Sequence, residues 1–262
     1  MPAVQSAAGR ITPRQAIQRF WEVDALRGVA IVMMVIFHLM WDLWAFHVLP
    51  DVVLWAGFWK YFQRTTATLF IMLVGVSLTL SYRRAAAKQG TDGLYLKFLI
   101  RGLRIFGLGM VVTVATRLFG MGFVDFGVLH LIGFSIAAAY PFLRYRWPNL
   151  VLWAVFFAAG HFVQQQHVDT RWLVWLGWTP IPYLPVDFFP IIPWFGVVLL
   201  GVFLGNTLYS QNGRAFFLPD LSTWLPVRLL ELLGRRSLII YLVHQPILLA
   251  LLALFGLIDL GL

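Results

Sequence analysis

Residues 24–48 read DALRGVAIVMMVIFHLMWDLWAFHV, an almost uninterrupted apolar stretch behind a charged start. A helix rises about 1.5 Å per residue, so about 20 such residues cross the roughly 30 Å hydrocarbon core of a bilayer. We therefore expect an all-α polytopic membrane protein with about seven transmembrane helices. The predicted spans are residues 26–48, 65–82, 98–119, 124–143, 147–165, 189–208 and 237–258.

The composition supports this class. Of the 262 residues, 60% are hydrophobic and 12% are charged. So few charged residues could not cover the surface of a water-soluble globule, and a disordered chain has the opposite composition. The absence of cysteine excludes disulfides, a cysteine nucleophile and cysteine-ligated zinc. With no second domain evident, we expect residues 1–262 to form one integral-membrane domain. Residues 52–62 are too short to span and rich in aromatic side chains, which predicts an interfacial segment.

The formal net charge of +9 is distributed unevenly along the chain. If the N-terminus is cytoplasmic, 16 of the 20 Lys and Arg residues fall on the inner side of the predicted spans. This distribution agrees with the positive-inside rule. Residues 1–20 lack the apolar core of a signal peptide, so we expect them to form a cytoplasmic segment and the C-terminus to lie outside. The charge therefore indicates topology, and no nucleic-acid partner is expected.

Ionisable residues inside the first predicted span are its most informative feature. A charge within a bilayer is costly, so each of them is a functional candidate. His38 is expected near mid-membrane, Asp42 one helical turn further along the same face, and His47 at the outer end. A carboxylate beside an imidazole can orient it as a general base. We interpret these three residues as catalytic candidates, and a core histidine bonded to a neighbouring helix is the alternative for His38.

Polar residues in later spans extend this set of candidates. His130, near the start of the fourth span, and Asp187, just before the sixth, are the remaining catalytic candidates, and a structural role is the alternative for His130. Asp187 has a structural alternative as a helix cap, because Pro190 follows it. His244 and Gln245 are expected in the inner half of the last span, where they would either line an inward-facing channel for a cofactor or form a polar packing cluster.

Four segments of the sequence resemble a known family. They are DALRGVAIVMMVIFH (24–38), FGVLHLIG (126–133), DFFPIIPWFGVVLLGVFLG (187–205) and LGRRSLIIYLVHQPIL (233–248). In this order they resemble bacterial relatives of the heparan-alpha-glucosaminide N-acetyltransferase catalytic domain, within the transmembrane acyltransferase superfamily. The spacing of Arg27 and His38 is also similar to the signature of the membrane acyltransferase-three proteins. The matching segments extend over nearly the whole chain.

The resemblance implies an acyl-CoA-dependent O- or N-acetyltransferase of the bacterial cytoplasmic (inner) membrane. It would move an acetyl group from cytoplasmic acetyl-CoA to a sugar or glycan acceptor on the outer side, without a metal. Arg27, Arg101 and Arg104 begin spans on the inner side and are the expected contacts for the phosphates of the donor, although positive-inside anchoring is the alternative for the last two. In the animal enzyme the catalytic His lies nearer the outer end, where His47 is the nearest counterpart. The choice between His38 and His47 therefore stays open.

Other functions compatible with this sequence have less support. Intramembrane His and Asp residues also suit a proton-coupled small-molecule transporter, but no internal repeat is evident. A haem- or quinone-binding subunit would need paired histidines. We expect His38, His130 and His244 at different depths, which disfavours haem ligation. A homo-oligomer is compatible with the sequence.

Overall fold

The structure of the chain is a computed structural model that describes residues 19–210 and 213–259, so residues 1–18 of the predicted N-terminal segment lie outside the described part. The described residues are mostly helical, and their longest helices are apolar enough to cross a membrane. Eight α-helices occur there: α1 (Trp21–Ala45), α2 (Gly57–Gln89), α3 (Leu94–Leu118), α4 (Val128–Ala138), α5 (Trp147–Val163), α6 (Ile191–Leu208), α7 (Leu225–Arg235) and α8 (Ser237–Leu254). A short 3₁₀ helix, η1 (Tyr140–Phe142), follows α4, and strands β1 (Tyr209–Ser210) and β2 (Gly213–Arg214) form a small hairpin.

The predicted spans correspond to helices, with differences in length. In the described residues five helices are long and apolar enough to cross a membrane, namely α1, α2, α3, α6 and α8. The fifth predicted span is the 17-residue α5, and the fourth is divided into the 11-residue α4 and the short helix η1. At 1.5 Å per residue, α4 reaches about 16 Å, which is short of a full crossing. The helical membrane class is confirmed, while the count of seven spans and their orientation stay predictions.

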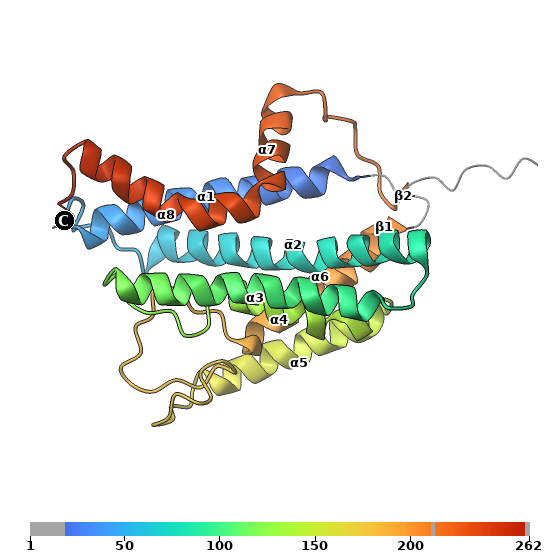
Figure 1. Ribbon diagram of the computed structural model, residues 1–262, viewed down its shortest axis with the longest axis horizontal. Coiled ribbons are helices and arrows are strands. Elements are labelled where there is room, and N and C mark those ends of the chain that lie inside the picture. Colours follow the sequence, from blue (N-terminus) through green and yellow to red (C-terminus); the bar gives the residue numbers. More distant parts are fainter. Residues whose placement is uncertain (1–18, 211–212, 260–262) are drawn as a thin grey trace, which may run out of the picture.

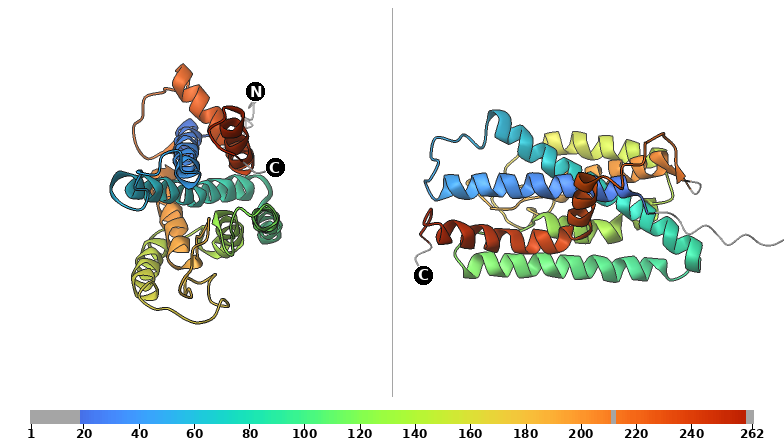
Figure 2. Two further views of the ribbon diagram at one scale, coloured as in Figure 1. Left: turned by 90° about the vertical axis from the view of Figure 1, so that its left-hand side faces the viewer. Right: turned by 90° about the horizontal axis from the view of Figure 1, so that it is seen from above.

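The long helices lie side by side along one axis (Figure 1). The start of α1, the end of α2, the start of α3 and the β hairpin lie together at one end, which we call the arginine end because Arg27, Arg83 and Arg101 belong to it. The opposite end is called the far end. Seen along the bundle in Figure 2, α7 and α8 lie on one side of α1, and α6 packs against α2.

Glycines allow the central helices α2 and α6 to approach closely. A Cβ atom added at Gly75 would overlap the carbonyl oxygen of Val198, and one added at Gly201 would overlap that of Met72. In lipid, the hydrophobic effect does not drive helices together. Small residues let the two backbones approach closely, so van der Waals contacts hold the helices together instead. The main core surrounds this contact and includes Ile71, Leu78, Leu131, Val198 and Val202.

Two features of the fold differ from the sequence prediction. Residues 57–62 of the predicted interfacial segment form the first turns of α2 instead of a separate element. The second feature is α7, which is absent from the predicted spans and runs across the bundle axis (Figure 1). It packs on α1 through Gly28 and Gly234, where added Cβ atoms would overlap the carbonyl oxygens of Leu230 and Asp24.

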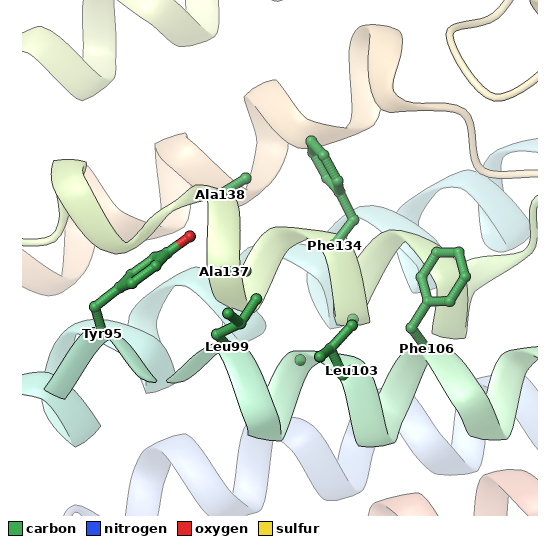
Figure 3. Close-up of a pocket in the computed structure, with 9 residues that line it drawn as sticks. Tyr95, Leu99, Leu103, Phe106, Phe134, Ala137 and Ala138 are labelled. Carbon is green, nitrogen blue, oxygen red and sulfur yellow. The ribbon is translucent and has the colours of Figure 1, made fainter. Parts of the chain in front are cut away.

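The surface between α3 and α4 contains an apolar groove (Figure 3). Its volume is about 410 Å³, and it extends from Tyr95 in the first turn of α3 to Phe106. The groove is formed by small residues of α4, including Gly133 and Ala137, that face α3.

Candidate functional site

His38 of α1 and His244 of α8 lie against each other. Their ring centroids are 4.7 Å apart and their planes are inclined by 77°, an edge-to-face arrangement. Nδ1 of His38 lies 2.9 Å from the carbonyl oxygen of Met34, and Nδ1 of His244 lies 2.7 Å from that of Tyr241. A carbonyl oxygen only accepts hydrogen bonds, so each Nδ1 carries the hydrogen and each Nε2 keeps its lone pair. Both imidazoles therefore have the tautomer in which Nε2 can act as a base.

Asp42 and Gln245 form a second pair between the same two helices. Nε2 of Gln245 donates to Oδ1 of Asp42 at 2.6 Å. The expected contact of Asp42 with the His38 imidazole is therefore not seen, because Nδ1 of His38 donates to the Met34 carbonyl oxygen and the Asp42 carboxylate accepts from Gln245. We call His38, Asp42, His244 and Gln245 the histidine cluster.

Three buried atoms of the histidine cluster lack a hydrogen-bond partner among residues 19–210 and 213–259. They are Oδ2 of Asp42, Nε2 of His244 and Oε1 of Gln245. All three are acceptors, and leaving a buried acceptor unpaired costs about 1–3 kcal/mol. A ligand or water that donates hydrogen bonds would offset this cost, so the cluster is suited to a donor-bearing molecule.

The depth expected for His244 was wrong. From the sequence, His244 is expected in the inner half of its span and at a different depth from His38, but the two rings are in contact. The expectation assumed that α8 begins at the membrane boundary. Instead, α7 crosses α1 at Gly28, so α8 begins alongside α1 and reaches the level of His38 within two turns. Rings in direct contact leave no room for a porphyrin between them, so this pair does not form a bis-histidine haem site.

Asp187 connects the loop before α6 to two other helices. Its Oδ2 accepts hydrogen bonds from the Val128 amide at 3.1 Å and from the Tyr241 hydroxyl at 3.2 Å. Burial raises the pKa of Asp187 to about 6, although both hydrogen bonds favour the charged form. Since the carbonyl of Tyr241 also accepts from His244, Asp187 holds the turn of α8 that orients this histidine.

His130 and His47 lie outside the contacts of the histidine cluster. His130 is buried in the first turn of α4, where its Nδ1 accepts from the Gly127 amide at 3.1 Å. This nitrogen therefore caps the start of α4. The next residue, Val128, donates its backbone amide to Asp187. His47 is exposed in the turn after α1 with a φ of 59°, a conformation uncommon for residues other than glycine.

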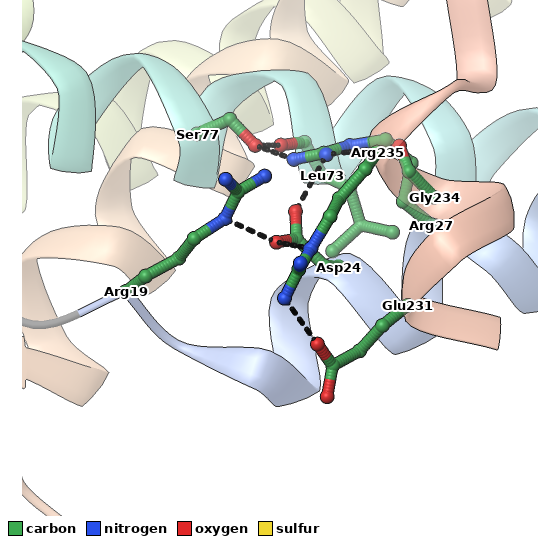
Figure 4. Close-up of polar contacts among 8 residues, drawn as sticks. All are labelled: Arg19, Asp24, Arg27, Leu73, Ser77, Glu231, Gly234 and Arg235. Atoms are coloured by element: carbon green, nitrogen blue, oxygen red, sulfur yellow. Dashed lines mark hydrogen bonds and ion pairs between the residues drawn. The ribbon is translucent and has the colours of Figure 1, made fainter. Parts of the chain in front are cut away.

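The arginine end contains a network around Asp24 (Figure 4). This carboxylate accepts from Arg19 at 2.7 Å and from Arg27 at 2.9 Å, and Arg235 lies 3.6 Å away. Arg27 also donates to the hydroxyl of Ser77 at 2.7 Å and to the carbonyl oxygen of Gly234 at 3.3 Å. Arg27 thus joins α1 to α2 and to the end of α7, with each terminal nitrogen engaged.

Arg101 and Arg104 differ from Arg27 in their exposure. Both are exposed on α3, and Arg101 makes a long hydrogen bond of 3.4 Å to Ser81. Ser81 lies one turn beyond Ser77 on α2, so Arg101 lies next to the network of Arg27. Their exposure distinguishes these two arginines from Arg27, whose terminal nitrogens are engaged within the protein.

Sequence reasoning missed Tyr241 and Asp24 as members of these two sites. Tyr241 precedes His244 by three residues and therefore shares its helix face, a signal that periodicity could have given. Asp24 precedes the first predicted span by two residues, so its position alone did not mark it as part of a site. In the described ranges, 19–210 and 213–259, no group of three metal-ligating side chains lies together.

Comparisons with known proteins identify the family. Residues 19–246 match the family model described as heparan-alpha-glucosaminide N-acetyltransferase, catalytic. The searches of curated proteins and of solved structures gave no match. The match covers both the histidine cluster and the arginine end, confirms the resemblance seen in the four sequence segments, and points to a transmembrane acetyltransferase. The chain therefore belongs to the family of the heparan-alpha-glucosaminide N-acetyltransferase catalytic domain.

Proposed function

We propose that the chain transfers the acetyl group of acetyl-CoA to a sugar or glycan acceptor, with the histidine cluster as the site of transfer. The contact between His38 and His244 carries this proposal, since both Nδ1 atoms are held by carbonyl oxygens and both Nε2 atoms are left as acceptors. An Nε2 lone pair can take the proton of an acceptor hydroxyl or amine as it attacks the thioester carbonyl. The imidazolium can then return the proton to the departing CoA sulfur.

The acceptor would bind through the unpartnered atoms of the cluster. Oδ2 of Asp42 and Oε1 of Gln245 are both buried acceptors, and hydroxyl or amine groups of a sugar would supply the missing donors. His38 is favoured over His47 as the base, because His38 lies in this cluster and His47 is exposed beyond the end of α1.

The donor would approach from the arginine end, which we propose to face the cytoplasm of a bacterial inner membrane. Arg101 and Arg104 supply guanidinium groups for the CoA phosphates, and planar guanidinium groups bind phosphate oxygens with paired hydrogen bonds. Arg27 acts as the residue that fixes the surrounding helices. Opposite entry of donor and acceptor would let both meet at the depth of His38.

The test is acetyl transfer by the purified protein in liposomes. Radiolabelled acetyl-CoA is supplied with a panel of amino sugars and neutral sugars, and acetylated products are separated and counted. Transfer to at least one sugar that is lost in the His38→Gln variant supports the proposal. No transfer to any acceptor, together with sugar uptake that does not need acetyl-CoA, would favour the proton-coupled transporter instead.

A further inference from the structure

The groove between α3 and α4 has a shape and chemistry that the acetyl transfer does not use. Eight of its nine lining residues have no polar side-chain atom, and Tyr95 is the exception. Leu99, Leu103 and Phe106 of α3 form one wall, and Phe134 and Ala137 of α4 belong to the other. Figure 3 shows Tyr95 at one end and the rings of Phe106 and Phe134 at the other. The groove is therefore apolar along its length, with one polar end.

Close backbone packing maintains the floor of this groove. A Cβ atom added at Gly102 would lie 2.6 Å from the carbonyl oxygen of Gly133, so the two helices touch there. Ala137 and Ala138, one turn further along α4, are too short to fill the space beside Leu99 and Tyr95. The hollow is thus a consequence of small residues on α4 and is present without any movement of the helices.

The length of the groove matches one leaflet of a membrane. From Tyr95 to Phe106 the helix rises about 16 Å. This is about half of the roughly 30 Å hydrocarbon core, and it starts in the first turn of α3 at the arginine end. A hydrocarbon chain that enters at this end would therefore lie along the groove and stop near the middle of the bilayer.

The polar end of the groove lies next to η1 and the turn that follows it. The ring of Tyr95 packs at 5.3 Å from that of Tyr140 in η1, and Arg144 follows Tyr140 by four residues in the turn after η1. Arg144 is exposed and stacks on the Tyr145 ring at 5.0 Å. One exposed guanidinium and two tyrosines thus belong to this end of the groove, and guanidinium and hydroxyl groups are common ligands of a phosphate group.

We propose that the α3–α4 groove binds one acyl chain of an anionic membrane phospholipid, with its phosphate beside Tyr95 and Arg144. Apolar contact along α3 supplies affinity for the chain, and the charge of Arg144 selects an anionic head group. This lipid site is separate from the histidine cluster, and it does not depend on the acetyl-transfer activity.

Native mass spectrometry of the purified, delipidated protein tests this site. The protein is titrated with phosphatidylglycerol and, in parallel, with phosphatidylcholine of the same chains. We expect one phosphatidylglycerol to bind about fivefold more tightly than phosphatidylcholine, the effect of one arginine near a lipid head group. Ala137→Trp fills the groove and should abolish this binding, whereas Val111→Trp, on the lipid-facing side of α3 outside the groove, should leave it intact.

Arg144→Gln tests recognition of the head group separately from binding of the acyl chain. It leaves the groove open, so its result does not depend on how Ala137→Trp folds. It should remove the preference for phosphatidylglycerol and leave binding of both lipids at the level of phosphatidylcholine. Equal binding of the two lipids to the unmodified protein would overturn the proposal, as would unchanged phosphatidylglycerol binding by Ala137→Trp. A dimer of the unmodified protein that Ala137→Trp converts to a monomer would show that a second copy occupies the groove instead, and would also overturn it.

Discussion

The imidazole of His244 lies edge-on to that of His38 at a centroid distance of 4.7 Å, although the two histidines belong to α8 and α1, the last and first helices of the described residues. Each is oriented by a carbonyl oxygen of its own helix, three or four residues earlier. The pair is thus positioned by local helix geometry, and its contact depends on how α8 packs against α1.

Replacement of either histidine should reduce turnover. We expect His38→Gln to lower kcat by about 100-fold or more, the usual contribution of a general base. If the two rings act as a unit, His244→Gln should lower kcat to a similar extent. The kcat of the double variant should then be only slightly below that of the less active single variant. The measurement is kcat for acetyl transfer in liposomes.

His47→Gln is the matched control for these variants. It removes an exposed imidazole beyond the end of α1 and should keep kcat within about twofold of the unmodified protein. Loss of activity in His47→Gln with full activity in His38→Gln would move the base to the end of α1.

The exposed arginines of α3 should affect donor binding without affecting turnover. We expect Arg101→Gln and Arg104→Gln each to raise the KM for acetyl-CoA by about tenfold, since a charged hydrogen bond to phosphate is worth about 1.5–3 kcal/mol and is weakened by solvent exposure. The effect should diminish at high salt. Arg171→Gln removes a cation from the loop before α6 and serves as the control; an equal increase in its KM would argue against a donor site on α3.

The helices and the chemistry-bearing residues of the first helix could be predicted from the sequence. Apolar length gives the spans directly, because a bilayer requires about 20 such residues. His38 and Asp42 stand out because an ionisable group in a long apolar stretch is rare. Both end up in the histidine cluster, with the contact to Gln245 in place of the expected contact between them.

The partnership of α1 with α8 could not be predicted, because it depends on α7. The segment LPVRLLELLGR has leucines at helical spacing and Pro226 in its first turn, but its 11 residues are too few to be predicted as a span. Because α7 packs on Gly28, α8 begins alongside α1, and this starting point determines that His244 lies at the level of His38. Sequence periodicity identifies such a helix but gives no information about the angle at which it crosses its neighbours.

The contact between α1 and α7 should be sensitive to a single methyl group. Gly28→Ala places a Cβ atom onto the carbonyl oxygen of Leu230, and we expect a loss of about 1–3 kcal/mol or failure to fold. Gly107→Ala on α3 is the control, because nothing lies within 4 Å of its added Cβ atom and alanine is the better helix former. Thermal unfolding in detergent compares the two; equal Tm values would contradict the close contact.

Asp187 should make stability depend on pH. Its folded-state pKa is raised from 3.8 to about 6, so the folded protein binds this proton more tightly than the unfolded chain does. Stability should therefore fall as the pH rises from about 4 to about 6 and then stay constant with respect to this group. Asp187→Asn has no such proton to lose, and its Tm should lack this decline. An identical pH dependence in both proteins would assign the effect to other groups.

The absence of cysteine makes the proposed orientation directly testable, because one introduced thiol is the sole thiol of the chain. Thr91→Cys lies exposed at the arginine end between α2 and α3, and Gln164→Cys lies exposed after α5 at the far end. If the arginine end faces the cytoplasm, as the excess of basic residues indicates, a membrane-impermeant maleimide added to spheroplasts should label only Gln164→Cys. Thr91→Cys should react after the membrane is permeabilised, which shows that its thiol is accessible. Labelling of Thr91→Cys in sealed spheroplasts would reverse the orientation and place Arg101 and Arg104 on the side opposite to cytoplasmic acetyl-CoA.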